Sequence, residues 1–76
     1  MSTLDQLKKI IAKVTHGAEG DIALNTPLKD IKADSLHWVQ IIIAVEGAFN
    51  TEVDVDAMKK FVTIGDFVQY IDKAKK

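Results

Sequence analysis

Asp34, Ser35 and Leu36 stand where a long irregular segment meets the most apolar stretch of the chain. A serine that begins a helix is exposed, and the free N–H groups of the first turn favour a phosphate there. A phosphate ester on Ser35 would also meet the positive end of the helix dipole, although the carboxylate of Asp34 opposes it. The tripeptide can therefore present an attachment site or a nucleophile, or it can simply cap a helix.

A catalytic set built from Asp34, Ser35 and His37 is not expected. Residues two apart on a helix point in directions about 200° apart, so Ser35 and His37 cannot readily share a side-chain hydrogen bond. A catalytic triad needs its base within hydrogen-bond reach of the nucleophile. The other histidine, His16, could come close only through the fold. We therefore predict no catalytic residues, and a chain that is not an enzyme.

A metal site is not expected either. Glu52, Asp54 and Asp56 alternate like half of a calcium-binding loop, but the required glycine and closing glutamate are missing. The chain has no cysteine, and its two histidines are isolated in sequence. A solvated start of a helix explains the three carboxylates better.

Apolar spacing predicts an all-α fold, a small bundle of three longer helices and one short helix. A long loop, His16 to Asp34, separates the first two helices and contains Gly17, Gly20 and a turn at Asn25 to Pro27. The last helix begins at Thr63, with Asp66 as a capping partner three residues later. The other predicted helices are Ser2 or Thr3 to about Thr15, Ser35 to Gly47–Asn50, and Asp54 or Asp56 to Lys60.

The second predicted helix is apolar over most of its circumference, which indicates a central position. At about 100° per residue, one side should face the core and the other should form a narrow exposed stripe bordered by Leu36 and Ile43. The core side comprises Trp38, Ile42, Val45 and Phe49, and the stripe comprises His37, Gln40, Ala44 and Gly47.

Length and charge exclude several classes of protein. The 76 residues allow one small domain, 1–76, and their net charge is −1. There is no arginine and the lysines are spread over both ends, so no nucleic-acid partner is expected. The longest wholly apolar run, Ile41 to Val45, is far too short to span a membrane. With no signal-peptide pattern, we expect a cytoplasmic monomer.

The segment from Asp30 to Phe49, DIKADSLHWVQIIIAVEGAF, closely resembles acyl carrier proteins, and so do Thr51 to Val53 and the helix start at Thr63. The resemblance implies that a phosphopantetheinyl transferase attaches 4'-phosphopantetheine from coenzyme A to Ser35. The thiol of this arm would then carry acyl groups as thioesters. Acyl-transferring and condensing enzymes of fatty-acid, polyketide or related pathways would be the partners.

The resemblance also assigns roles to neighbouring residues. Asp34 should assist recognition or metal-dependent transfer at Ser35, and Leu36 should offer an apolar contact. Trp38 stands where the family commonly has a smaller residue, so it either reshapes the acyl cavity or packs as ordinary core. The partner-docking residues would be Leu36, His37, Gln40, Ile43, Glu46 and Gly47, and the acyl-pocket residues Trp38, Ile42 and Phe49.

Departures from the family pattern point to a specialised carrier rather than the housekeeping fatty-acid carrier. His37 and Gln40 occupy positions where acids are common, and Gly47 replaces another, whereas Glu46 keeps the pattern. Such a stripe should dock weakly to enzymes with basic patches. Lys32 also stands where the family usually has glycine.

Two other classes of binding protein fit the sequence less well. Peptidyl carriers of the nonribosomal type usually show two glycines near the modified serine, which argues against that type here. The strongest alternative is a helical protein-interaction module with an unmodified Ser35, which would dock through Leu36, Gln40, Ile43 and Gly47.

Overall fold

A computed structural model describes residues 2–17, 20, 22–31 and 33–74 of the chain. Within this part the structure has four α-helices and one short 3₁₀ turn, η2, at Leu28–Asp30. The predicted all-α class, with three longer helices, one short helix and a long first loop, is confirmed. The α-helices are α1 at Thr3–Thr15, α2 at Ser35–Phe49, α3 at Val55–Met58 and α4 at Ile64–Ala74.

Helix α1 begins and ends with local caps. The Ser2 hydroxyl accepts a hydrogen bond from the N–H of Asp5 at 3.1 Å, as an N-cap should. At the other end His16 adopts a left-handed conformation with φ of 59°, and the helix ends at Thr15, as predicted. Its buried residues Leu7 and Ile11 lie on one stripe and face the core.

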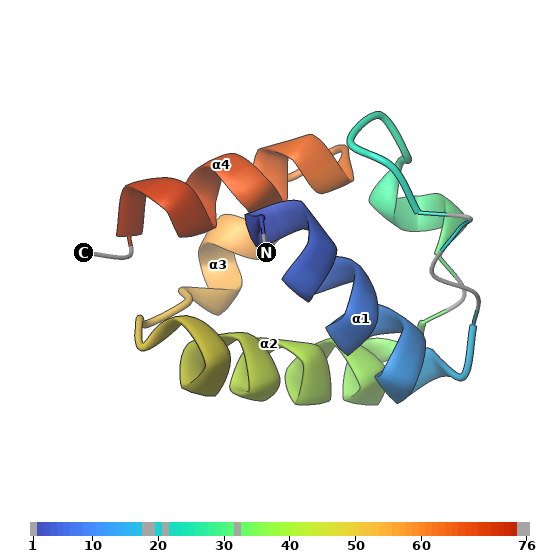
Figure 1. The fold of residues 1–76 in the computed structure, drawn as a ribbon, viewed down its shortest axis with the longest axis horizontal. Coiled ribbons are helices and arrows are strands. Elements are labelled where there is room, and N and C mark those ends of the chain that lie inside the picture. The colour runs from blue at the N-terminus through green and yellow to red at the C-terminus, as the bar shows by residue number, and fades with distance from the viewer. Residues whose placement is uncertain (1, 18–19, 21, 32, 75–76) are drawn as a thin grey trace.

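Helix α2 runs beneath α1 and supplies the lower layer of the bundle in Figure 1. It begins after Asp34 and ends at Asn50, which is left-handed with φ of 52° and confirms the predicted stop. Its fully buried residues include Ile41, which the predicted core stripe omitted. Trp38 and Phe49, predicted as core, are only half-buried and pack against it. The side of α2 that faces the core is therefore rotated from the predicted side, so that it includes Ile41.

One core joins the helices. Helix α1 lies across both α2 and α4, while α3 bridges the far ends of α2 and α4 (Figure 1). The hydroxyl of Thr3 donates to the carboxylate of Asp72 at 2.5 Å and ties the start of α1 to α4. The buried apolar residues are Leu7, Ile11, Ile22, Ile41, Ile42, Val45, Val53, Ile64, Phe67 and Ile71.

The long first loop is fixed to the start of α4 by backbone hydrogen bonds. The N–H of Leu28 donates to Val62 O at 2.9 Å, and the N–H of Ile64 donates to Thr26 O at 2.9 Å. The N–H of Gly65 donates to Leu24 O at 2.7 Å. This pairing, centred on the bridge between Pro27 and Thr63, orders the segment that leads into α2.

Two predicted helix boundaries shift. The third helix ends at Met58 rather than Lys60, because the N–H groups that follow form tighter turn bonds, Lys59 N–H to Asp56 O at 3.3 Å among them. The fourth begins at Ile64, and Thr63 caps it as predicted. The N–H of Thr63 donates to Asp66 Oδ2 at 3.1 Å, and the N–H of Asp66 donates to Thr63 Oγ1 at 3.4 Å.

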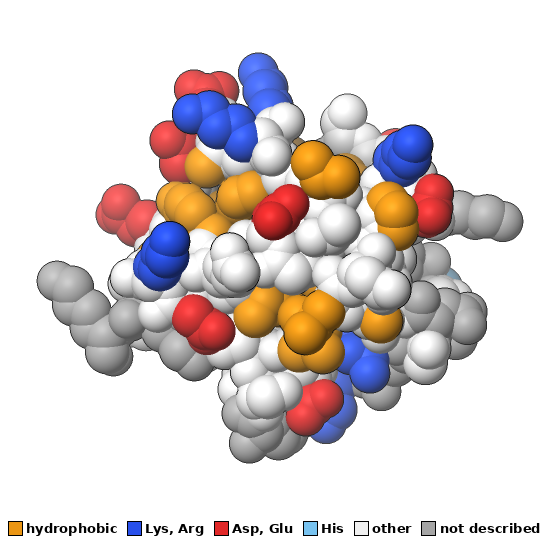
Figure 2. Space-filling model, turned by 90° about the horizontal axis from the view of Figure 1, so that it is seen from above, with side chains coloured by type: hydrophobic (Ala, Val, Ile, Leu, Met, Phe, Trp, Pro, Cys, Tyr) orange, Lys and Arg blue, Asp and Glu red, His pale blue; other side chains and the backbone are white. Residues whose placement is uncertain are grey.

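The described surface carries charges of both signs. Figure 2, seen from above α4, shows small apolar groups interspersed with lysines and carboxylates. No basic stripe of the kind that binds nucleic acid gathers on this face among the described residues. None of the helices in the described ranges has the length and apolar character needed to cross a membrane.

Candidate functional site

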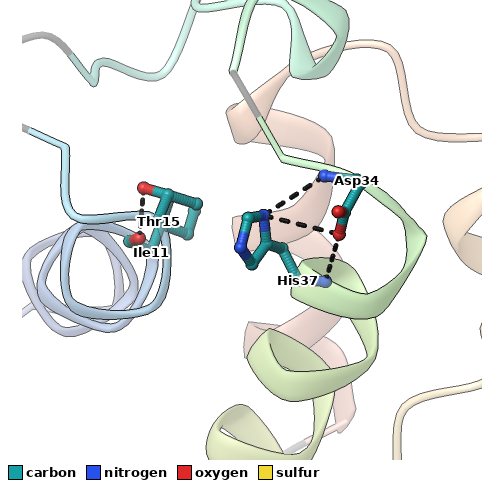
Figure 3. A network of polar contacts seen from close by, with 4 residues as sticks. All are labelled: Ile11, Thr15, Asp34 and His37. Atoms are coloured by element: carbon teal, nitrogen blue, oxygen red, sulfur yellow. Dashed lines mark hydrogen bonds and ion pairs between the residues drawn. The ribbon is translucent and has the colours of Figure 1, made fainter.

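The start of α2 is held by a reciprocal pair of hydrogen bonds between Asp34 and His37. The N–H of His37 donates to Asp34 Oδ1 at 2.9 Å, and the N–H of Asp34 donates to His37 Nδ1 at 3.3 Å. Figure 3 shows both bonds, with the imidazole turned toward the last turn of α1 around Thr15. The pair is a capping box in which histidine takes the place usual for Glu or Gln. It fixes the backbone on both sides of Ser35.

Ser35 is the first residue of α2 and is exposed. The N–H groups of Ser35 and Leu36 lie in the first turn, where a helix has no acceptor of its own for them. A phosphate ester on the Ser35 hydroxyl therefore fits the site, since these amides and the helix dipole favour an anion. Asp34, whose side chain is 72% exposed, is the one opposing charge in the capping pair.

His37 is not arranged as a base for Ser35. Its Nδ1 accepts the Asp34 N–H and lies 3.5 Å from Asp34 Oδ1, so the ring is engaged with residue 34. The described structure shows no hydrogen bond between His37 and the Ser35 hydroxyl. The arrangement presents a serine at a capped helix start, without the relay that nucleophilic catalysis requires.

The outward face of α2 is largely apolar. Leu36 is 64% exposed, Val39 48% and Ile43 63%. With Gln40 and Gly47, which are also exposed, these residues follow the helical spacing i, i+3, i+4, i+7 and i+11. Val39 was not predicted to lie on this face, although its spacing from Leu36 and Ile43 indicates that it does. His37 and Ala44, assigned to the stripe, are half-buried at its edge.

Glu46 is used within the molecule. Its Oε2 accepts a hydrogen bond from the N–H of Val53 at 3.0 Å, and the side chain is half-buried. The carboxylate therefore holds the connection between α2 and α3. Since Glu46 is the one acidic residue in α2, the outward face of this helix carries no carboxylate.

The structure does not bring the three predicted acyl-pocket residues together in one cavity. Ile42 is buried in the core, while Trp38 and Phe49 are half-buried at opposite ends of α2. A hollow of about 670 Å³ lies instead between the end of α1 and the first loop. Ile11, Ile22 and Ile31 line it, and none of the three predicted residues does. The acyl-pocket assignment stays a prediction.

Two further predictions from the sequence concern the carboxylates of residues 52–56, which were not expected to bind a metal, and Lys32. Within the described ranges, no three His, Cys, Asp or Glu side chains come together as metal ligands. The Asp54 carboxylate accepts the N–H of Asp56 at 2.9 Å, so it caps α3 as a solvated helix start should. Lys32 lies outside the described residues.

Comparison with known proteins places these features in one family. The phosphopantetheine attachment site family matches residues 5–71. The acyl carrier protein of Desulforapulum autotrophicum is 37% identical over 75 residues, which cover 96% of this chain and 97% of that protein. The solution NMR structure of the holo acyl carrier protein from Geobacter metallireducens superposes with a TM-score of 0.81 at 27% identity. That match covers 97% of this chain and 86% of that one.

The family match covers most of the chain. The Desulforapulum autotrophicum protein, 37% identical, matches it over nearly its whole length. The helical order and the capped serine at the start of α2 agree with that assignment. The chain therefore belongs to the acyl carrier proteins, non-catalytic carriers that hold acyl groups on phosphopantetheine and exchange them with biosynthetic enzymes.

Proposed function

We propose that Ser35 is the residue that bears the 4'-phosphopantetheine arm. One observation carries the proposal: Ser35 is exposed as the first residue of α2, beside first-turn N–H groups that favour a phosphate. When bound, the arm supplies a thiol that holds acyl groups as thioesters. The capping box of Asp34 and His37 keeps the backbone around Ser35 in place, and the exposed Asp34 carboxylate is available to a modifying enzyme.

Peptide mapping after co-expression with a phosphopantetheinyl transferase tests the assignment. A phosphopantetheine adduct on the peptide that contains Ser35 is expected, and an adduct on another serine or threonine would refute it. A folded protein that no active transferase modifies would favour the unmodified interaction module.

The wider setting follows from the same proposal. Residues 1–76 would act as a single carrier domain, as a monomer in the cytoplasm. A phosphopantetheinyl transferase would convert the apo form, and acyl-transferring and condensing enzymes would load and unload the arm. The single core shared by the helices supports the one-domain assignment.

A specialised pathway is favoured over housekeeping fatty-acid synthesis. The support is the outward face of α2, which carries no carboxylate, because Glu46 is bonded to the Val53 N–H. Enzymes that present arginine and lysine would gain little attraction from this face. The holo protein should therefore show a lower kcat/KM with housekeeping fatty-acid synthase enzymes than their own carrier does. Equal kinetics would remove the basis for a specialised role.

Trp38 is proposed to limit the acyl chain that the bundle can shelter, with Ile42 and Phe49 farther along α2. The half-buried indole packs against the core and occupies space at the end of α2 near Ser35. In Trp38→Ala, longer acyl chains should become protected from solvent, measured by thioester hydrolysis over a graded series. If both proteins protect the same lengths, Trp38 is ordinary core.

A further inference from the structure

The capping box at the start of α2 contains a titratable ring, His37, in the position usual for Glu or Gln. Its Nδ1 accepts the N–H of Asp34 at 3.3 Å, which requires a neutral imidazole with its proton on Nε2. Histidine is the side chain that changes charge between about pH 5 and about pH 8. The side chain of His37 is 36% exposed, so protons from solvent can reach it. The box therefore includes a hydrogen bond that mild acid can remove.

Protonation would exchange one partner of the imidazole for another. A proton added to Nδ1 takes up the lone pair that accepts the Asp34 N–H, and the same nitrogen lies 3.5 Å from Asp34 Oδ1. The imidazolium would therefore be drawn to this carboxylate oxygen, which also accepts the His37 N–H at 2.9 Å. A positive charge in the first turn of a helix is also opposed by the helix dipole. The acid form thus loses one bond of the box and neutralises the charge of Asp34.

Among the described residues, Asp34 is the one charged partner of the ring. Figure 3 shows the imidazole between Asp34 and the last turn of α1. In that turn the Thr15 hydroxyl donates to a carbonyl of its own helix at 2.8 Å. The titratable groups at this end of α1 are Lys13 and His16, which are exposed, and within the described ranges neither forms a hydrogen bond or ion pair with His37. A change in the charge of His37 therefore acts first on Asp34.

We propose that His37 is a positioning residue for the modification of Ser35, and that protonation of its imidazole slows the transfer. The backbone N–H that the ring accepts lies one residue before the attachment hydroxyl. A misplacement of about 1 Å can cost about a hundredfold in the rate of a positioned reaction. Loss of the bond frees this backbone, and pairing with the imidazolium conceals the carboxylate that a transferase can contact. The inference rests on the proposed function, since it concerns the rate at which Ser35 receives its arm.

The pH dependence of phosphopantetheine transfer tests the role of His37. The kcat/KM of one phosphopantetheinyl transferase, with coenzyme A, is measured on the wild-type chain and on His37→Gln at about pH 8 and about pH 5.5. Glutamine completes a capping box without titrating, and the shared enzyme contributes the same pH dependence to both measurements. On acidification the wild-type value should fall about threefold more than that of His37→Gln, the effect expected for loss of about one hydrogen bond.

Two further variants separate the titration from the structure of the cap. His37→Ala cannot complete the box at any pH, so its kcat/KM at about pH 8 should lie below that of His37→Gln. His16→Asn removes the other histidine and places there a residue that tolerates the left-handed conformation. It should keep the pH dependence of the wild-type chain, because His16 takes no part in the box.

NMR of the unmodified protein follows the box without a transferase. The amide signal of Asp34 should move as His37 titrates in the wild-type chain and should stay in place over the same pH range in His37→Gln. An equal fall of kcat/KM in both proteins, or an Asp34 signal that ignores the titration of His37, would overturn the inference. In either case the adduct on Ser35 still forms and the carrier assignment stands. A folded wild-type chain that no active transferase modifies would contradict the assignment of Ser35, and the inference with it.

Discussion

At the scale of single residues, Asp34 serves the fold and is placed to serve recognition as well. Its Oδ1 accepts the His37 N–H at 2.9 Å, which caps α2. The same side chain remains 72% exposed, so an enzyme that approaches Ser35 can contact it. A cap needs only an oxygen acceptor, whereas recognition of the carboxylate needs its charge. The two roles are therefore separable by substitution.

Asp34→Asn and Asp34→Ala should separate them. Asparagine caps a helix about as well as aspartate, so Asp34→Asn should unfold in urea near the wild-type midpoint. Asp34→Ala should lose about 1 kcal/mol of the free energy of unfolding. Both should be modified more slowly at Ser35 if the charge assists the transferase. Full transfer kinetics in Asp34→Asn would show that the residue is a cap alone.

At the scale of secondary-structure elements, the first loop is fastened to α4 where Gly65 lies. The N–H of Gly65 donates to Leu24 O at 2.7 Å, and a Cβ at position 65 would lie 3.1 Å from the same oxygen. Because that oxygen belongs to the backbone, it cannot rotate away as a side chain could. A Cβ at position 47, by contrast, would meet no atom within 4 Å. A side chain at position 65 would thus be crowded by the loop backbone, whereas one at position 47 would be unhindered.

The two alanine variants should change stability in opposite directions. Gly47→Ala should raise the free energy of unfolding by about 0.5–1 kcal/mol, because alanine favours the helix and meets no neighbour. Gly65→Ala should lower it by about 1 kcal/mol, because the added methyl group displaces the loop. Urea unfolding of both proteins measures the difference. Stabilisation of similar size in both would show that the loop yields to the methyl group.

The start of α4 makes stability depend on pH. The N–H of Val62, at 2.8 Å, and that of Thr63, at 3.1 Å, donate to Asp66 Oδ2 and lower the pKa of this carboxyl below its ordinary 3.8. A group whose pKa is lower in the folded state stabilises the fold above its unfolded pKa. That stabilisation is lost as the pH falls through the lowered folded value.

Asp66→Asn should therefore flatten the acid side of the stability curve. The urea midpoint of the wild-type protein should fall between about pH 5 and about pH 2.5, and the fall should be smaller in Asp66→Asn. The comparison isolates one carboxyl, since the other acids are shared. Parallel curves would show that the cap contributes no pH dependence.

At the scale of the whole molecule, local patterns predicted the helices and long-range contacts set their orientation. Helical spacing located both ends of α1 and the start of α4 within about one residue of the observed positions. Helix α2 is apolar around most of its circumference, so spacing alone could not choose between Ile41 and Phe49 as the more buried residue. The packing of α1 across α2 decides this, and it also leaves Val39 exposed.

The first loop and the functional site also differ in how far they could be predicted from the sequence. Ser35 and its cap could be predicted because both lie within one short segment. The pairing of Pro27 with Thr63 joins residues 36 positions apart through backbone groups, which leave no pattern in the side chains. The histidine half of the capping box was also missed, because Glu or Gln is the usual residue at that position.

Intact-protein mass spectrometry tests the central claim most directly. The folded wild-type chain and Ser35→Ala are each incubated with coenzyme A and a promiscuous phosphopantetheinyl transferase. A single phosphopantetheine adduct on the wild-type chain, absent from Ser35→Ala, is the predicted result. An adduct that persists in Ser35→Ala, or none on the wild-type chain with several active transferases, would contradict the assignment of Ser35 as the site of the arm.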